Sequence, residues 1–281
     1  SAQAIGLAKL PPGKYHPFEL DTEGLGVLLD AAMARGARRC LIGIGGSATN
    51  DAGFGLARAL GWQFFNPQGE RLNRWTELHA LAQVRPPDRA PAFEELIVAV
   101  DVQNRLLGPA GCTRVYGPQK GLRPEEFEFA ERCLEHLVNI IERELHLDCA
   151  SQPGGGAAGG LGYGLFCFAG ARLEPGFGLF ARYARLAQRL PDAQLVITGE
   201  GAIDASTLMG KGVGELAVLC RQFGVPCLGL AGAVLAAESH PPLFTKTYAL
   251  TPGLVTREQA LAEPAVHLER LAAQAARDCE C

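Results

Sequence analysis

The chain has 281 residues, of which 48% are hydrophobic and 20% charged, and its formal net charge is −4. This mildly acidic balance argues against nucleic acid or an anionic membrane as a partner. No apolar run approaches the length of a bilayer span. The nine cysteines are scattered without a Cys-x-x-Cys pair, so a zinc or redox motif is unsupported and a reducing, cytoplasmic setting is expected.

A chain of this length is near the size at which single cores split, so two α/β domains are predicted. Its first residues, Ser1-Ala2-Gln3-Ala4, show neither a Met nor a recognisable domain start. We therefore expect the sequence to begin partway into a longer protein.

An amphipathic helix is predicted over 23–39, and the apolar run over 40–44 predicts a buried strand. Glycines and helix-starting polar side chains follow, before a predicted helix over 51–60. A strand, a glycine loop and a helix in this order direct backbone N–H groups and the positive helix end at an anion. The predicted anion contacts are the amides of Gly45 and Gly46 and the side chains of Ser47 and Thr49.

Two other interpretations of this loop stay open. Gly43-x-Gly45-x-x-Ala48 matches a dinucleotide fingerprint, but no acidic residue stands about twenty positions on, where the ribose would need it. The glycines could equally form a structural turn that lets the helix pack closely on the strand.

The next predicted elements are a hairpin over 62–72 and a polar, proline-rich loop over 73–93. The β-branched run over 95–100 predicts a second buried strand. It ends on Asp101, with Asn104 three residues later, at the strand end where α/β enzymes place functional side chains. The alternative is that Asp101 only caps the following turn.

Lys120 lies between glycines in Tyr116-Gly117-Pro118-Gln119-Lys120-Gly121, which predicts a loop rather than a helix around it. Glycines let a ligand approach the backbone closely, so Lys120 is a candidate phosphate contact, with an ordinary solvated lysine as the alternative. The glycine-rich stretch over 153–164 continues into apolar residues, which predicts a packed loop or helix start rather than a flexible linker. A further helix is predicted over 177–190.

A further buried strand, followed by a second glycine loop, is predicted where residues 194–198 lead into Gly199-Glu200-Gly201. Asp204 and Lys211 follow, without the spacing of a Walker A loop. Two carboxylates and a lysine after a strand suit phosphoryl transfer, because a carboxylate can hold Mg2+ or accept the hydroxyl proton while a lysine neutralises phosphoryl charge. The alternative is that both carboxylates only cap the next helix. The element order from residue 191 predicts half of an open parallel sheet.

Four blocks in this order and spacing resemble the type-1 glycerate kinases of bacteria, from about residue 23 to the C-terminus. The blocks are Gly43-Ile44-Gly45-Gly46-Ser47-Ala48-Thr49-Asn50-Asp51, Tyr116-Gly117-Pro118-Gln119-Lys120-Gly121, Gly156-Ala157-Ala158-Gly159-Gly160-Leu161-Gly162, and Thr198-Gly199-Glu200-Gly201 with Asp204, Gly210 and Lys211. The resemblance implies phosphorylation of D-glycerate with ATP and Mg2+, at the 2-hydroxyl, in glyoxylate or aldarate catabolism.

The resemblance also implies two α/β domains with the active site in the cleft between them. Residues 1–190 would be the inserted mixed α/β domain. Residues 191–281 would be the C-terminal part of a Rossmann-like domain, whose parallel sheet is incomplete here.

The sequence departs from the family pattern at three places. An opening strand, a loop rich in Asp, Ser, Phe and Lys, and a Gly-Gly-Glu-Gly segment are missing; if those loops contribute to the active site, this chain would fold without being active. Ala202 stands where Arg is expected, and Arg105 where Pro is usual.

The predicted catalytic residues are Asp204, Glu200 and Lys211, with Asp204 and Glu200 as the Mg2+ contacts. The predicted substrate and phosphate contacts are Gly45, Gly46, Ser47, Thr49, Asn50, Asp51, Asp101, Asn104 and Lys120. The expected partner is a small molecule, and a homodimer is compatible with the prediction. Two competing classes are a module that binds a small hydroxy acid without turnover and a nicotinamide-dependent oxidoreductase.

Overall fold

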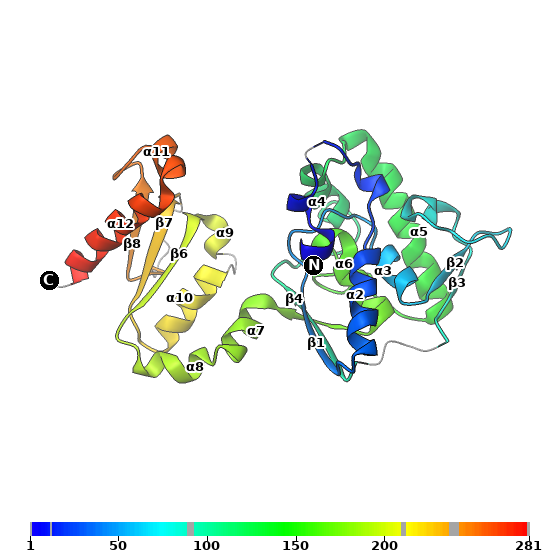
Figure 1. Cartoon of the computed structure of the whole chain (residues 1–281), viewed down its shortest axis with the longest axis horizontal. Helices are drawn as coiled ribbons and strands as arrows, with labels where there is room; N and C mark the ends of the chain where they lie inside the picture. Colours follow the sequence, from blue (N-terminus) through cyan, green and yellow to red (C-terminus); the bar gives the residue numbers. More distant parts are fainter. Residues whose placement is uncertain (1, 12, 89–92, 209–211, 236–241, 280–281) are drawn as a thin grey trace. The chain divides into compact units, whose positions relative to one another are not determined.

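The computed structural model describes residues 2–11, 13–88, 93–208, 212–235 and 242–279. The chain divides into two compact units, Ser1–Gly176 and Phe177–Cys281 (Figure 1). This division falls earlier than the predicted boundary at 190, because Leu186 and Leu190 pack into the core of the second unit. The assignment of the units as inserted and Rossmann-like domains stays a prediction.

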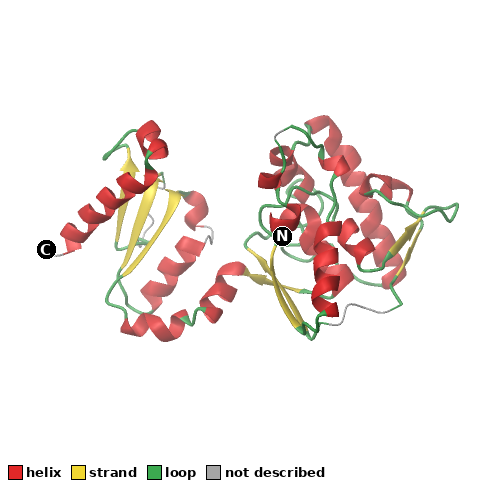
Figure 2. Cartoon of the chain, in the orientation of Figure 1, coloured by secondary structure: helices red, strands yellow, loops and turns green. Residues whose placement is uncertain are grey.

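The first unit combines helices with one parallel and one antiparallel sheet (Figure 2). Its elements are α1 (Ala2–Ile5), η1 (Leu7–Lys9), η2 (Pro17–Glu19), α2 (Glu23–Ala34), β1 (Arg39–Gly43), α3 (Phe54–Ala59), β2 (Gln63–Phe65), η3 (Trp75–Ala80), β3 (Gln83–Arg85), β4 (Glu95–Val100), α4 (Cys112–Lys120), η4 (Pro124–Glu126), α5 (Phe127–Leu145), α6 (Ala157–Ala169) and β5 (Arg172–Pro175).

The parallel sheet has the strand order β1-β4-β5. The central strand β4 is buried as predicted, with Ile97 and Val98 almost inaccessible to solvent. The prediction of a buried strand is wrong for β1, where Leu41 is 50% exposed. Since β1 lies at the edge of the sheet, only part of its apolar run is covered.

The hairpin predicted over 62–72 forms only in part. A turn and an isolated bridge between Phe65 and Arg71 are present, but the strand partner of β2 is β3. The segment around β3 was predicted to be a loop, and this prediction is wrong. Phe64 of β2 and Val84 of β3 are both buried in one hydrophobic cluster, so core packing selects this pairing.

The second unit is built around one parallel sheet with the order β6-β7-β8, so the predicted parallel pairing is confirmed. Its elements are α7 (Gly176–Tyr183), α8 (Leu186–Arg189), η5 (Leu190–Asp192), β6 (Val196–Ile203), α9 (Ala205–Leu208), α10 (Gly212–Gln222), β7 (Cys227–Val234), β8 (Lys246–Thr251), α11 (Arg257–Ala262) and α12 (Pro264–Cys279).

Three predictions for the second unit need correction. The strand predicted over 194–198 is not buried, because β6 lies at the edge of its sheet and Ile197 is 59% exposed. The helix predicted over 177–190 is interrupted between α7 and α8, where Arg185 has a left-handed φ of 54°. Glu200 lies within β6 rather than in a glycine loop, because the pairing with β7 continues through Glu200 and Ala231 to Ile203 and Val234.

Among the residues that the structure describes, no helix has both the length and the apolar character needed to cross a membrane. The fold class of the whole chain is α/β with parallel sheets, as the sequence predicts. The predicted site residues do not all lie in loops after parallel strands, since Glu200 is part of β6 and Lys120 ends α4.

Candidate active site

The loop between β1 and α3 forms a buried hydroxyl pair. The hydroxyl oxygens of Ser47 and Thr49 are 2.8 Å apart, and the Thr49 amide donates to Ser47 Oγ at 3.1 Å. Both side chains are buried, and Gly6 pairs with Ser47 in an antiparallel bridge. The exposed part of this loop is therefore the backbone at Gly45 and Gly46.

Asp51 is saturated by hydrogen bonds from the protein itself. Its Oδ2 accepts from the amide and hydroxyl of Thr22 at 2.9 and 2.7 Å and from the Gly55 amide at 2.9 Å. Oδ1 accepts from the Gly53 amide at 3.2 Å. Burial raises the pKa of Asp51, and the hydrogen bonds from Gly55 and Thr22 oppose this rise. Asp51 thus joins the starts of α2 and α3, and these contacts leave its predicted ligand contact unsupported.

Lys120 lies beneath this loop and not in a loop of its own. It is the last residue of α4, which Gly121 ends, so the predicted loop conformation is wrong. The helix from Cys112 continues through Pro118, although proline removes a backbone hydrogen bond and crowds the preceding turn. Lys120 Nζ is buried and donates to the carbonyl oxygen of Thr49 at 2.6 Å. Burial lowers the pKa of Lys120 to about 8.

Asn50 is fully buried beside this lysine-bearing helix. Its Nδ2 donates to Thr113 Oγ1 at 3.1 Å, whereas its Oδ1 has no hydrogen-bond partner within the described ranges. Asn50 therefore ties the loop to α4, below the exposed glycines.

The glycine-rich stretch before and within α6 is packed rather than flexible, as predicted, and the structure places it directly against the same loop. Gly159 has a φ of +74°, and a Cβ there would collide with the carbonyl oxygen of Thr49. A Cβ on Gly164 would collide with the backbone of Gly53. Two glycine-containing segments are thus in backbone contact, which makes the loop a rigid platform.

Asp101 and Asn104 follow β4 but have different surroundings. Asn104 is engaged on both sides, since Oδ1 accepts from the Tyr116 hydroxyl at 2.6 Å and Nδ2 donates to the Ala110 carbonyl at 2.8 Å. Asp101 is exposed, and no group in the described part of the chain hydrogen-bonds to its carboxylate. Gly43 of β1 pairs with Ala99 of β4, so both strands end at the same level of the sheet. Asp101 therefore lies beside the same carboxyl ends of the strands as the exposed loop glycines.

In the second unit, the Thr207 side chain links the Glu200 carboxylate to the backbone of Asp204. Thr207 Oγ1 donates to Glu200 Oε1 at 2.5 Å and accepts from the Asp204 amide at 3.1 Å. The sequence pattern gave Thr207 no role, although its place three residues after Asp204, in a first helical turn, is the signal that could have marked it. Lys211, predicted to be catalytic, lies outside the described residues.

The carboxylates of Glu200 and Asp204 fit the chemistry of magnesium. Mg2+ is usually held by one or two protein carboxylates together with phosphate oxygens and waters. Within the described ranges, no three His, Cys, Asp or Glu side chains gather as a metal site.

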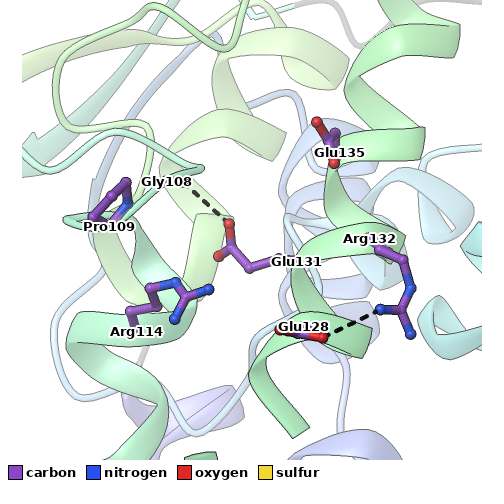
Figure 3. Close-up of a pocket in the computed structure, with 7 residues that line it drawn as sticks. All are labelled: Gly108, Pro109, Arg114, Glu128, Glu131, Arg132 and Glu135. Carbon is purple, nitrogen blue, oxygen red and sulfur yellow. Dashed lines mark hydrogen bonds and ion pairs between the residues drawn. The ribbon is translucent and has the colours of Figure 1, made fainter.

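A separate cavity of about 450 Å³ opens in the first unit (Figure 3). It is lined by Gly108, Pro109, Arg114, Glu128, Glu131, Arg132 and Glu135, none of which is a predicted site residue. Within it, Glu131 accepts a 3.1 Å hydrogen bond from the Gly108 amide. Arg132 Nη1 lies 4.0 Å from Glu128 Oε2 in an ion pair along the same helix. This cavity is not the site that the strand ends define.

The comparisons with known proteins cover nearly the whole chain. The model of the glycerate kinase family matches residues 1–280. The glycerate kinase of Halalkalibacterium halodurans is 39% identical over 280 residues, which are 99% of this chain and 73% of that protein. The glycerate 2-kinase of Escherichia coli is 36% identical over 236 residues, or 83% of this chain and 62% of that protein.

A solved structure from Salmonella typhimurium LT2, assigned as a glycerate kinase 2, superposes with a TM-score of 0.73. It is 32% identical, and the match covers 100% of this chain and 75% of the other. The parallel sheets and these matches define the class as an α/β kinase. The chain belongs to the glycerate kinase family.

Proposed function

We propose that the protein transfers the γ-phosphoryl group of ATP to the 2-hydroxyl of D-glycerate, giving 2-phosphoglycerate for glyoxylate, glycerate or aldarate catabolism. The observation that carries this proposal is the arrangement of Glu200, Asp204 and Thr207 at the carboxyl end of β6. Family membership supports the reaction, and the similarity to a protein named glycerate 2-kinase supports the position of the phosphoryl group.

The proposed chemistry asks mainly for alignment and charge neutralisation. The substrate hydroxyl oxygen forms a bond to the γ-phosphorus, the bond between that phosphorus and the bridging oxygen breaks, and ADP leaves. Asp204 accepts the hydroxyl proton in this scheme. Glu200 and Asp204 would hold Mg2+, which when bound neutralises phosphate charge, and Lys211 would add a cation.

In this proposal D-glycerate binds at the carboxyl ends of β1 and β4 in the first unit. Gly45 and Gly46 present exposed backbone for the substrate carboxylate, and the exposed Asp101 accepts a hydrogen bond from a substrate hydroxyl. Ser47, Thr49, Asn50 and Lys120 act from beneath, by holding the loop. Cytoplasmic location, homodimeric assembly and the absence of a nucleic-acid partner are part of the same proposal.

The test is an assay of the full-length protein with ATP, Mg2+ and D-glycerate, with the product identified by phosphorus NMR. We expect 2-phosphoglycerate and one ADP for each product molecule, with no product from L-glycerate. Folded protein that releases no ADP in the presence of D-glycerate would contradict the proposal.

The same samples distinguish the competing classes. A binding module would be stabilised by D-glycerate in thermal unfolding, with or without ATP, and would form no product. A nicotinamide-dependent oxidoreductase would change the fluorescence of added NADH.

A further inference from the structure

The hydroxyl group of Thr207 contacts both Glu200 and Asp204, two acidic residues of the second unit. Thr207 is completely buried. Its Oγ1 accepts from the Asp204 amide at 3.1 Å, so its single hydrogen is left for Glu200 Oε1, 2.5 Å away. A hydrogen bond from a hydroxyl to an ionised carboxylate is short and strong, which matches this distance.

The position of Thr207 is itself fixed by the backbone. The Thr207 amide donates to the Asp204 carbonyl at 3.0 Å. On its other side, a Cβ on Gly214 of α10 would collide with the Thr207 carbonyl oxygen, so the two backbones are in direct contact. Thr207 therefore cannot shift without moving α9 against α10.

Glu200 comes from a different element, the strand β6, where it pairs with Ala231. In the part of the chain that the structure describes, Glu200 Oε1 accepts from Thr207 and Oε2 has no hydrogen-bond partner. A glutamate side chain held at only one oxygen has a defined direction and still keeps one oxygen for a ligand. Without that contact its rotamers would be free to interconvert.

We propose that Thr207 is a positioning residue: it holds one oxygen of Glu200 so that the other faces the reacting groups, and it fixes the backbone of Asp204 beside it. This inference rests on the proposed function of the site. Thr207 touches neither substrate nor metal in this scheme. Removing a partner that orients a metal-binding carboxylate typically lowers activity about 10- to 100-fold.

The test compares Thr207→Val, which keeps the shape and loses the hydroxyl, with Thr207→Ser, which keeps the hydroxyl. The matched control is Thr251→Val, which removes one part-buried hydroxyl, bonded to the Gly232 carbonyl, from another strand of the same sheet. We expect kcat to fall about 10- to 100-fold in Thr207→Val, with KM for D-glycerate nearly unchanged. Thr207→Ser and Thr251→Val should stay close to the wild-type kcat.

A merely structural role would lower the melting temperature of both valine variants and spare kcat in the folded fraction. The proposal is overturned if Thr207→Val keeps the wild-type kcat, or if kcat falls as far in Thr207→Ser as in Thr207→Val. If the wild type itself does not phosphorylate D-glycerate, the proposed function fails. The positioning claim is then decided by a crystal structure of Thr207→Val: a reoriented Glu200 carboxylate supports it, and an unmoved one overturns it.

Discussion

The ammonium group of Lys120 donates a 2.6 Å hydrogen bond to the carbonyl oxygen of Thr49 in the interior of the first unit. The cation thus supports the glycine loop from below, where the nearby charge of Asp51 opposes the effect of burial. A charge in this position costs folding free energy, since few polar groups replace the water it loses. Such a cost is typical of groups that serve a functional site.

The first prediction concerns stability against pH in the variant Lys120→Met. Burial lowers the pKa of Lys120 from its usual 10.5 to about 8 in the folded protein. Below pH 8 both folded and unfolded chains are protonated, so the cost of burying the charge is fully present. Between pH 8 and 10.5 the folded chain loses the proton first, and the stability of the wild type should rise by about 3 kcal/mol relative to Lys120→Met.

The measurement is urea unfolding of both proteins at pH values from 7 to 10. A matched control is Lys246→Met, because Lys246 is exposed and its ion pair with Asp278 raises rather than lowers its pKa. The difference between wild type and Lys246→Met should not grow over this range. A constant difference between wild type and Lys120→Met would mean that the buried lysine titrates normally.

The second prediction concerns the backbone contact between the glycine-rich stretch and the loop. Gly159→Ala should destabilise the fold by more than about 3 kcal/mol, because its Cβ would strike the Thr49 carbonyl at a left-handed backbone position. Gly170→Ala, at φ +66° but with open space around it, should cost only about 1 kcal/mol. Equal losses in the two variants, measured by chemical unfolding, would show that backbone strain alone accounts for both.

The third prediction concerns the carboxylate that joins α2 and α3. Asp51→Asn should lower the free energy of unfolding by roughly 2–3 kcal/mol, because its amide would face donors that now bond to a carboxylate oxygen. Thr22→Val should cost about 1–2 kcal/mol. In the double variant the two losses should not add, since both remove the same contact. Additive losses in a double-mutant cycle would argue that the two side chains act independently.

The sequence predicts the parallel sheets well because continuous β-branched runs such as that of β4 have few alternatives. The sequence does not predict that Glu200 lies within a strand, because β6 is extended there by pairing with Ala231, thirty-one residues further on. The glycines and the proline around Lys120 predict a loop, yet tertiary packing extends the helix through them. A local sequence pattern does not reveal contacts between residues that are far apart in the chain.

The site shows the same limit. The residue types predict an anion contact at the first glycine loop and phosphoryl-transfer chemistry around Glu200 and Asp204, but which side chains can reach a ligand depends on burial. Asp51 and Lys120 are charged residues that sequence reasoning assigns to a ligand, whereas the structure surrounds both with protein groups. Thr207 is the reverse case, a common residue whose position between Glu200 and Asp204 becomes visible only in three dimensions.

The central claim is that the carboxyl end of β6 carries the chemistry, and turnover by Asp204→Asn tests it most directly. The control is Asp278→Asn, which removes an exposed carboxylate of α12 in the same unit. With ATP, Mg2+ and D-glycerate, the account predicts that kcat falls at least about 100-fold in Asp204→Asn and is unchanged in Asp278→Asn. A wild-type kcat in folded Asp204→Asn would contradict it.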